Sequence, residues 1–232
     1  MPDPHCYASL QVCGLRVAAL DVDGSPLVGA GNGYSSDALI DVDVALEYED
    51  GDEFTVKNGC GAICQTFRDC DKLLRASVDL DLCVLDSELM ALFVPGSRIF
   101  TDTGTGDTIG YELPATNAEC GDGVALELWT KAWDGNSQAL PPFLGGATPA
   151  YIRWIFPKVT GRMGDFTLEN EILRVPVSLT AEANSGMDPA GPFGDWNVDV
   201  AAAGGITNVG GYFYDDGPPT AECGYIAVPA GS

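Results

Sequence analysis

Two stretches decide the fold of this chain: DVDVALEYE at residues 41–49 and SVDLDLCVL at residues 77–85. In both, apolar and acidic residues alternate with a period of two, the period with which side chains change face along a β-strand. Both stretches are therefore predicted to be half-buried strands. Their polar face carries carboxylates and neither lysine nor arginine, and its members are Asp41, Asp43, Glu47, Glu49, Asp79 and Asp81.

The two strands also predict a direction for each face. We expect the six carboxylates to share the concave side of one sheet, with the valines and leucines opposite them forming the core. A shift of one residue in strand register exchanges the two faces completely, so the prediction holds for the whole set or fails for it.

The totals favour one mainly-β domain. A length of 232 residues and an apolar fraction of 46% are those of a globular protein with a real core, and 29 glycines and 15 prolines indicate many turns. The sequence predicts seven or eight short strands, one short helix and long loops. This is the pattern of a β-sandwich or barrel.

The charge balance excludes some classes of partner. The chain has 11 lysines and arginines against 34 acidic residues, which gives a net charge of −23. Proteins bind nucleic acid largely by neutralising phosphates with lysine and arginine, so specific binding of DNA or RNA is not expected. An anionic membrane surface is an equally poor partner.

Local signals divide the chain further. Residues 1–12 are predicted to be an N-terminal arm, Asp50-Gly51-Asp52 a hairpin turn with a return strand at 53–59, and residues 62–74 a short helix or an irregular loop. Asp86 is predicted to cap a helix at 87–94 that ends at Pro95-Gly96.

Residues 28–37 and 97–110 are predicted loops that become ordered only in contact with neighbouring molecules. Further strands are expected at 124–133, 151–159 and 173–179, with Pro157 indicating an edge or a strand end. Residues 184–232 form a predicted Gly/Pro-rich C-terminal extension.

No catalytic motif is present. The single histidine, His5, lies in the predicted arm, and neither a nucleophile elbow nor a phosphate-binding loop occurs. The enzymatic alternative is a glycosidase that uses Asp41/Asp43 or Asp79/Asp81, with exposed tryptophans stacking on sugars. Against it, no aromatic residue is interleaved on the acidic face. Tryptophans in such a chain more often lie in a core or a subunit interface.

The eight cysteines leave three alternatives open: buried structural thiols, which we favour, one or two disulfides, or a metal site. Cys60, Cys64 and Cys70 cluster in sequence, but their C-x3-C-x5-C spacing is not a usual zinc pattern. No metal or other cofactor is expected.

Several strings resemble the major tail tube proteins of long-tailed, siphovirus-like bacteriophages that infect actinobacteria. They are the first acidic strand with its continuation NGCGAICQTF, LDLCVLDSELMALFVPG, ALELWTKAW and YIRWIFPKVTGRMGDFTLENEILRVPVSLTAEA, and they span about residues 36–183. The end of the chain, GPFGDW through DDGPP, is also similar to such proteins.

The resemblance implies a structural virion protein without enzymatic activity. It implies a single tail-tube-like β domain over residues 1–232 that assembles with itself into hexameric rings, stacked into a hollow tube. The six carboxylates would face the lumen, through which DNA passes without specific binding, and Trp129, Trp133, Trp154 and Phe156 are candidate interface residues. Its partners would be other tail proteins, and it would not bind a membrane. It would be located in the virion tail, after assembly in the host cytoplasm. The alternatives are a capsid decoration or tail adaptor protein, or a glycan-binding or glycan-cleaving sandwich.

Overall fold

A computed structural model describes residues 8–116, 121–133, 151–166, 174–196, 208–215 and 223–230. Within these ranges the chain has thirteen strands and one helix, so the fold is mainly β, as the sequence predicts. The one helix described is too short to cross a membrane.

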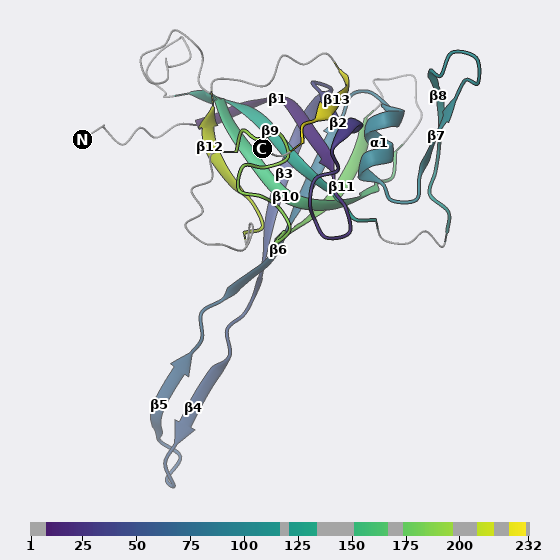
Figure 1. Cartoon of the computed structure of the whole chain (residues 1–232). Helices are drawn as coiled ribbons and strands as arrows, with labels where there is room; N and C mark the ends of the chain where they lie inside the picture. The colour runs from purple at the N-terminus through teal and green to yellow at the C-terminus, as the bar shows by residue number, and fades with distance from the viewer. Residues whose placement is uncertain are drawn as a thin grey trace.

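The elements follow one another in Figure 1 as β1 (Ala8–Ala19), β2 (Gly29–Ser36), β3 (Leu39–Glu49), β4 (Glu53–Lys57), β5 (Ile63–Arg68), β6 (Lys72–Leu82), α1 (Ser87–Phe93), β7 (Arg98–Thr101), β8 (Thr108–Glu112), β9 (Val124–Trp133), β10 (Tyr151–Met163), β11 (Val175–Glu182), β12 (Gly211–Asp215) and β13 (Gly224–Val228).

Nine strands form one antiparallel sheet in the order β13-β2-β1-β9-β10-β11-β6-β3, with β12 paired to the first half of β10. The second half of β10 pairs with β11, so β12 and β11 follow one another along the same edge of β10. The sheet curls until β3 reaches β1, and the two are in contact although they are not paired. The result is a barrel-like wall around one core.

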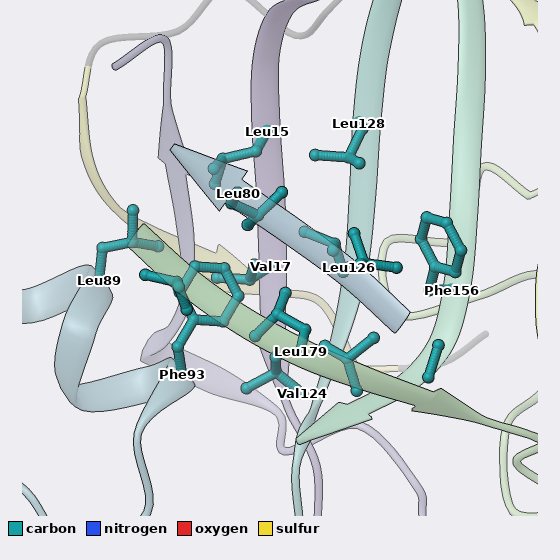
Figure 2. Packing of buried hydrophobic residues seen from close by; sticks show 14 of the residues in the cluster. Leu15, Val17, Leu80, Leu89, Phe93, Val124, Leu126, Leu128, Phe156 and Leu179 are labelled. Atoms are coloured by element: carbon teal, nitrogen blue, oxygen red, sulfur yellow. The ribbon is translucent and has the colours of Figure 1, made fainter. Parts of the chain in front are cut away.

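The core lies inside this wall and is closed at one end by α1. Figure 2 shows side chains from β1, β6, β9, β10 and β11 meeting there, with Leu89 and Phe93 of the helix packed against them. The apolar positions that alternation predicts on β6, β9 and β11 are buried in it: Val78, Leu80, Leu82, Leu126, Leu128, Val175, Val177 and Leu179. Leu173 lies outside the described residues.

The predicted helix is confirmed, together with its cap. The carboxylate of Asp86 accepts hydrogen bonds from the backbone N–H groups of Glu88 and Leu89, which satisfies two donors that a helix start leaves without partners. The same carboxylate accepts a short hydrogen bond from the hydroxyl of Tyr34 on β2. One aspartate therefore starts the helix and ties it to the sheet.

The hairpin turn predicted at residues 50–52 is wrong. The chain continues through these residues into β4, and β3 and β6 extend beyond the body as a long two-stranded arm that ends in the β4–β5 hairpin (Figure 1). At the predicted turn the outgoing and returning segments of the chain are hydrogen-bonded to each other: Asp69 N–H donates to Asp52 O over 2.9 Å. A Cβ on Gly51 would lie 2.0 Å from Asp69 O, so the glycine permits this close approach.

The chain reverses instead at Asn58–Gly61, where Gly61 has a positive φ of 83° and donates to Asn58 O. The helix or loop predicted over residues 62–74 is accordingly wrong, because that segment contains β5 and the start of β6. We call residues 44–75 the arm.

Other predicted loops are strands as well. Residues 28–37 contain β2, which lies between β1 and β13, and residues 97–110 contain most of the β7–β8 hairpin. Glycine suits β2 because β13 packs closely on it: a Cβ on Gly33 would lie 2.9 Å from Ile226 O. The C-terminal extension supplies β12 and β13. At the other end of the chain, β1 already begins at Ala8, inside the N-terminal segment 1–12 that was predicted to be extended and separate from the fold.

Pro157 lies within a central strand rather than at an edge. β10 pairs with β9 on one side and with β11 and β12 on the other, and the register between β10 and β9 shifts between Phe156 and Val159. A proline lacks the N–H that a sheet ladder needs, and an irregularity in the pairing accommodates that loss.

The core position of Leu126 gives a test of this fold. Because its side chain is fully buried, Leu126→Ala should lower the free energy of unfolding by about 2–5 kcal/mol in urea denaturation. The matched control is Val22→Ala, at a valine that is 82% exposed, where the change should be within about 0.5 kcal/mol. Equal losses in the two variants would contradict the assignment of the core.

Candidate functional site

The acidic residues of β3 and β6 meet across the strand pair. In the antiparallel register Asp41 is opposite Asp81 and Asp43 is opposite Asp79, on the same face of the two strands. Side chains directly opposite one another in such a pair have Cβ atoms about 4.5–5.5 Å apart, and like charges there repel. The next two carboxylates face cations, because Glu47 is opposite Arg75 and Glu49 is opposite Lys72.

Little positive charge compensates the aspartates. Arg75 Nε donates to Glu47 Oε2 over 2.6 Å, and Arg174 Nη1 lies 3.9 Å from Asp81 Oδ2. Both pairs are largely exposed, where ion pairs contribute about 0–1 kcal/mol. Within the described residues, no ion pair includes Asp41, Asp43 or Asp79.

The acidic face continues onto β11 as a hydroxyl-rich surface. Ser178 is opposite Asp79 and Thr180 is opposite Ser77, and both line a polar hollow of about 550 Å³ together with Thr160, Arg162 and Arg75. The positions of β6 and β11 that pair beside the aspartates carry no aromatic ring. We call the face made by Asp41, Asp43, Glu47, Glu49, Asp79 and Asp81 the acidic face.

The expected side of the sheet needs correction. The core fills the concave inside of the curled sheet, so the acidic face lies on its outer side. The apolar residues opposite it form core on β6, but on β3 they do so only near its start: Leu39 and Val42 pack against the core, whereas Val44, Leu46 and Tyr48 are 45%, 53% and 57% exposed. The reason is that β3 leaves the body and becomes the arm.

The four candidate interface residues separate into three groups. Trp129 and Phe156 are buried within their own chain, so they offer no surface to a neighbour. Trp154 is half-buried, donates from Nε1 to Thr130 Oγ1 over 3.1 Å, and packs on Tyr212. The side chain of Trp133 lies outside the described residues.

A buried ionic cluster is the feature that sequence reasoning missed. Glu127 of β9 has no exposed surface, although strand alternation places it opposite the core. Its Oε2 accepts from Arg16 Nη2 over 2.6 Å and its Oε1 accepts from Trp196 Nε1 over 2.5 Å. Asp195 lies 2.8 Å from Arg16 Nη2 and 3.0 Å from Arg153 Nη1.

Aromatic rings enclose this cluster. The guanidinium of Arg16 lies 3.9 Å from the ring centre of Phe193, and that of Arg153 lies 4.3 Å from the ring centre of Phe213. Both also lie over Trp129. Cations stacked on rings in this way gain from the negative ring face. The available signal in the sequence was a lone arginine within each of two apolar strand segments, GLRVAAL and YIRWIF.

The two carboxylates of the cluster respond differently to their surroundings. Burial raises the pKa of Glu127, against the lowering effect of Arg16 and Arg153. Partial burial alone would also raise the pKa of Asp195, but hydrogen bonds and charge from Arg16 and Arg153 outweigh it and hold that pKa below its ordinary value. The cluster is a structural clamp: it fixes the segment around Asp195 to the outside of β1, β9 and β10.

The expectation of mostly buried thiols is wrong for the described cysteines. Cys60, Cys64 and Cys70 on the arm, Cys83 just after β6 and Cys223 are free and exposed, and Cys13 is half-buried. Among the residues that the structure describes, no group of three or more His, Cys, Asp and Glu side chains is placed to hold a metal ion.

No protein-family model matches this sequence, and a search of curated proteins finds no match.

The clamp makes a prediction about stability. Glu127→Ala leaves the two buried arginines with only the partly exposed carboxylate of Asp195, so it should lower the free energy of unfolding by about 3–5 kcal/mol. The control Glu47→Ala removes a carboxylate from an exposed pair with the same 2.6 Å contact and should cost about 0–1 kcal/mol. Similar losses in the two variants, measured by chemical denaturation at neutral pH, would show that the Glu127 cluster is not a clamp.

Asp195 makes a prediction about pH. Its folded-state pKa is lowered, so its contribution is present above the unfolded-state pKa of about 3.9 and is lost as the pH falls through the lower folded value. Asp195→Asn should therefore destabilise the protein by about 1 kcal/mol at pH 7, because the side chain is partly exposed. The gap between the wild type and the variant should narrow below about pH 4. A gap that does not change between pH 7 and pH 3 would contradict the lowered pKa.

Proposed function

We propose that this protein is a structural virion subunit, the major tail tube protein of a long-tailed bacteriophage, without enzymatic activity. In this proposal copies of the chain assemble into stacked rings around a channel, and the acidic face lines that channel. The observation that carries the proposal is the acidic face itself, with two pairs of aspartates directly opposite one another and no compensating ion pair at three of the four.

The opposed aspartates of the acidic face carry an electrostatic cost that a particular use of the surface would explain. Like charges directly opposite one another destabilise a strand pair, and the acidic face has two such pairs in succession. Solubility alone does not require this arrangement, because dispersed carboxylates would serve it equally well. A surface that must not bind a passing polyanion does require uncompensated negative charge.

The strength with which basic surfaces bind DNA phosphates also favours an acidic wall for a channel that DNA passes through. A protein that neutralises 6–10 phosphates loses roughly 10³–10⁵ in affinity between low and moderate salt, which measures how strongly a basic wall would hold DNA. An acidic wall repels the phosphates and retains water and counterions that screen its own repulsion. DNA would then pass without stopping.

The arm supports self-assembly. It carries apolar side chains that are exposed in the single chain, among them Phe54, Val56, Ile63 and Phe67, each 56–64% exposed. Soluble monomers rarely leave a contiguous apolar surface of this kind uncovered. A decoration or adaptor protein would share these features but would bind an existing structure rather than polymerise alone.

Electron microscopy of the purified full-length protein tests the proposal. Negatively stained samples should contain hollow tubes of uniform diameter, or rings, which form more readily as the protein concentration and the salt concentration rise. Salt favours assembly because it screens the repulsion between the acidic faces. A protein that stays monomeric at every concentration and salt condition would overturn the tail tube proposal.

The charge of the face predicts the behaviour of a variant. Asp43→Lys combined with Asp79→Lys should leave folding and tube assembly intact, because Asp43 is exposed and Asp79 is on the outer side of the sheet. Virions that carry the variant should eject DNA severalfold more slowly, with the defect shrinking as salt rises.

The matched control changes the same charge elsewhere. Asp107→Lys combined with Asp122→Lys alters two exposed carboxylates off the acidic face and should not slow ejection. Equal slowing in both variants, or none in either, would show that the acidic face does not line the channel.

A further inference from the structure

The arm projects far from the body, and the body does not cover the apolar side chains that the arm carries. From residue 44 to the turn near residue 59 it spans about 15 residues, or roughly 50 Å at about 3.3 Å per residue. Figure 1 shows it pointing away from the barrel, with β4 and β5 paired only to each other. A two-stranded hairpin alone is at best marginally stable in water, so its apolar side chains need a partner surface.

The tip of the arm has a definite chemistry. Phe54 and Phe67 are directly opposite one another in the β4–β5 pairing and both are more than half exposed. Around the turn, residues 54–67 hold one cation, Lys57, and no carboxylate, whereas Arg68 is already paired with Asp71 at 3.1 Å. The tip therefore carries an aromatic pair and a single lysine, on a chain whose net charge is −23.

The body offers a groove of complementary chemistry. A hollow of about 320 Å³ lies where β3 passes β1, β9 and β10, with Val12, Val42, Val44, Leu128 and Trp154 as its apolar lining and Asp41 as its charged group. In Figure 2, Leu128, which lines this groove, lies on the side of the core away from Leu89 and Phe93 of α1. The volume is ample for a phenyl ring, and Trp154 offers an aromatic surface to it.

We infer that the arm tip of one copy docks in this groove of a second copy, with its phenyl rings against Val44 and Trp154 and Lys57 beside Asp41. The occupant is a second copy because the arm leads away from the groove beside its own root, and Lys57 of the tip is opposite in charge to Asp41 of the groove. The contact joins two different surfaces, so it continues from copy to copy in a head-to-tail series. This inference rests on the proposal that the chain assembles with itself, and it names the contact that drives assembly.

Two variants separate the two halves of the contact. Phe54→Ser combined with Phe67→Ser removes the aromatic pair from exposed positions and leaves the groove intact. Val44→Lys places a cation in the groove at a 45% exposed position and leaves the tip intact. Val22→Ser, at an exposed valine on the body, is the matched control. Circular dichroism and thermal denaturation establish that each variant is folded.

Analytical ultracentrifugation then measures assembly of each variant alone and of the mixture. Each of the two variants should need at least about tenfold more protein than the wild type to assemble, and the control should match the wild type. An equimolar mixture of the tip variant and the groove variant should form discrete dimers and no longer species. The reason is that the intact tip of one fits the intact groove of the other, and the chain of contacts then stops.

The outcomes distinguish this inference from the proposed function. If the wild type assembles and both variants assemble equally well, or if the mixture forms no dimers, the tip does not dock in this groove, although the tail tube proposal stands. If the wild type does not assemble under any condition, both fall. Dimers in the mixture, with neither variant dimeric alone at the same concentration, are the result that we expect.

Discussion

The structure depends on how Glu127 is neutralised. This carboxylate lies at the centre of β9, with no exposed surface, on the face of the sheet that does not contact the main core. An isolated charge there would cost several kcal/mol, and removing one member of a buried pair is among the costliest single changes. Arg16, Arg153 and Trp196 supply its partners, so strands β1 and β10 and the segment near residue 196 are held at one point.

The clamp at Glu127 has a consequence for the rest of the sheet. It gives β9 and β10 a buried environment on both faces: the main core on the inside, and on the outside a second apolar cluster that includes Ala125, Ile155 and Trp196. The middle of the sheet is therefore buried on both of its faces. The strands β6 and β3 lie at one end of the strand order, where β3 has only β6 as a paired neighbour, and the two leave the body together as the arm.

The arm and the acidic face are two products of the same strand pair. Near the barrel the pair has a buried side and a charged side, and the charged side is almost free of cations. Farther out both sides are exposed, the carboxylates stop after Glu53, and an aromatic pair and Lys57 take their place. A single hairpin thus carries a repelling surface at its root and an adhesive one at its tip, an arrangement that fits a subunit that binds its own copies while leaving polyanions unbound.

The sequence by itself determined the mainly-β class, the strand faces of β6, β9 and β11, and the capped helix, because these depend on alternation and on contacts within a few residues. It also placed the acidic residues of each strand on a common face, since a period of two is enough to put Asp79 and Asp81 on the same side of β6. Only the tertiary structure decided that Asp50-Gly51-Asp52 is not a turn, because Gly51 and Asp52 lie beside a strand about twenty residues away. Only the tertiary structure buried Glu127, because its partners come from residues 16, 153 and 196, and no local pattern records which distant charges will meet.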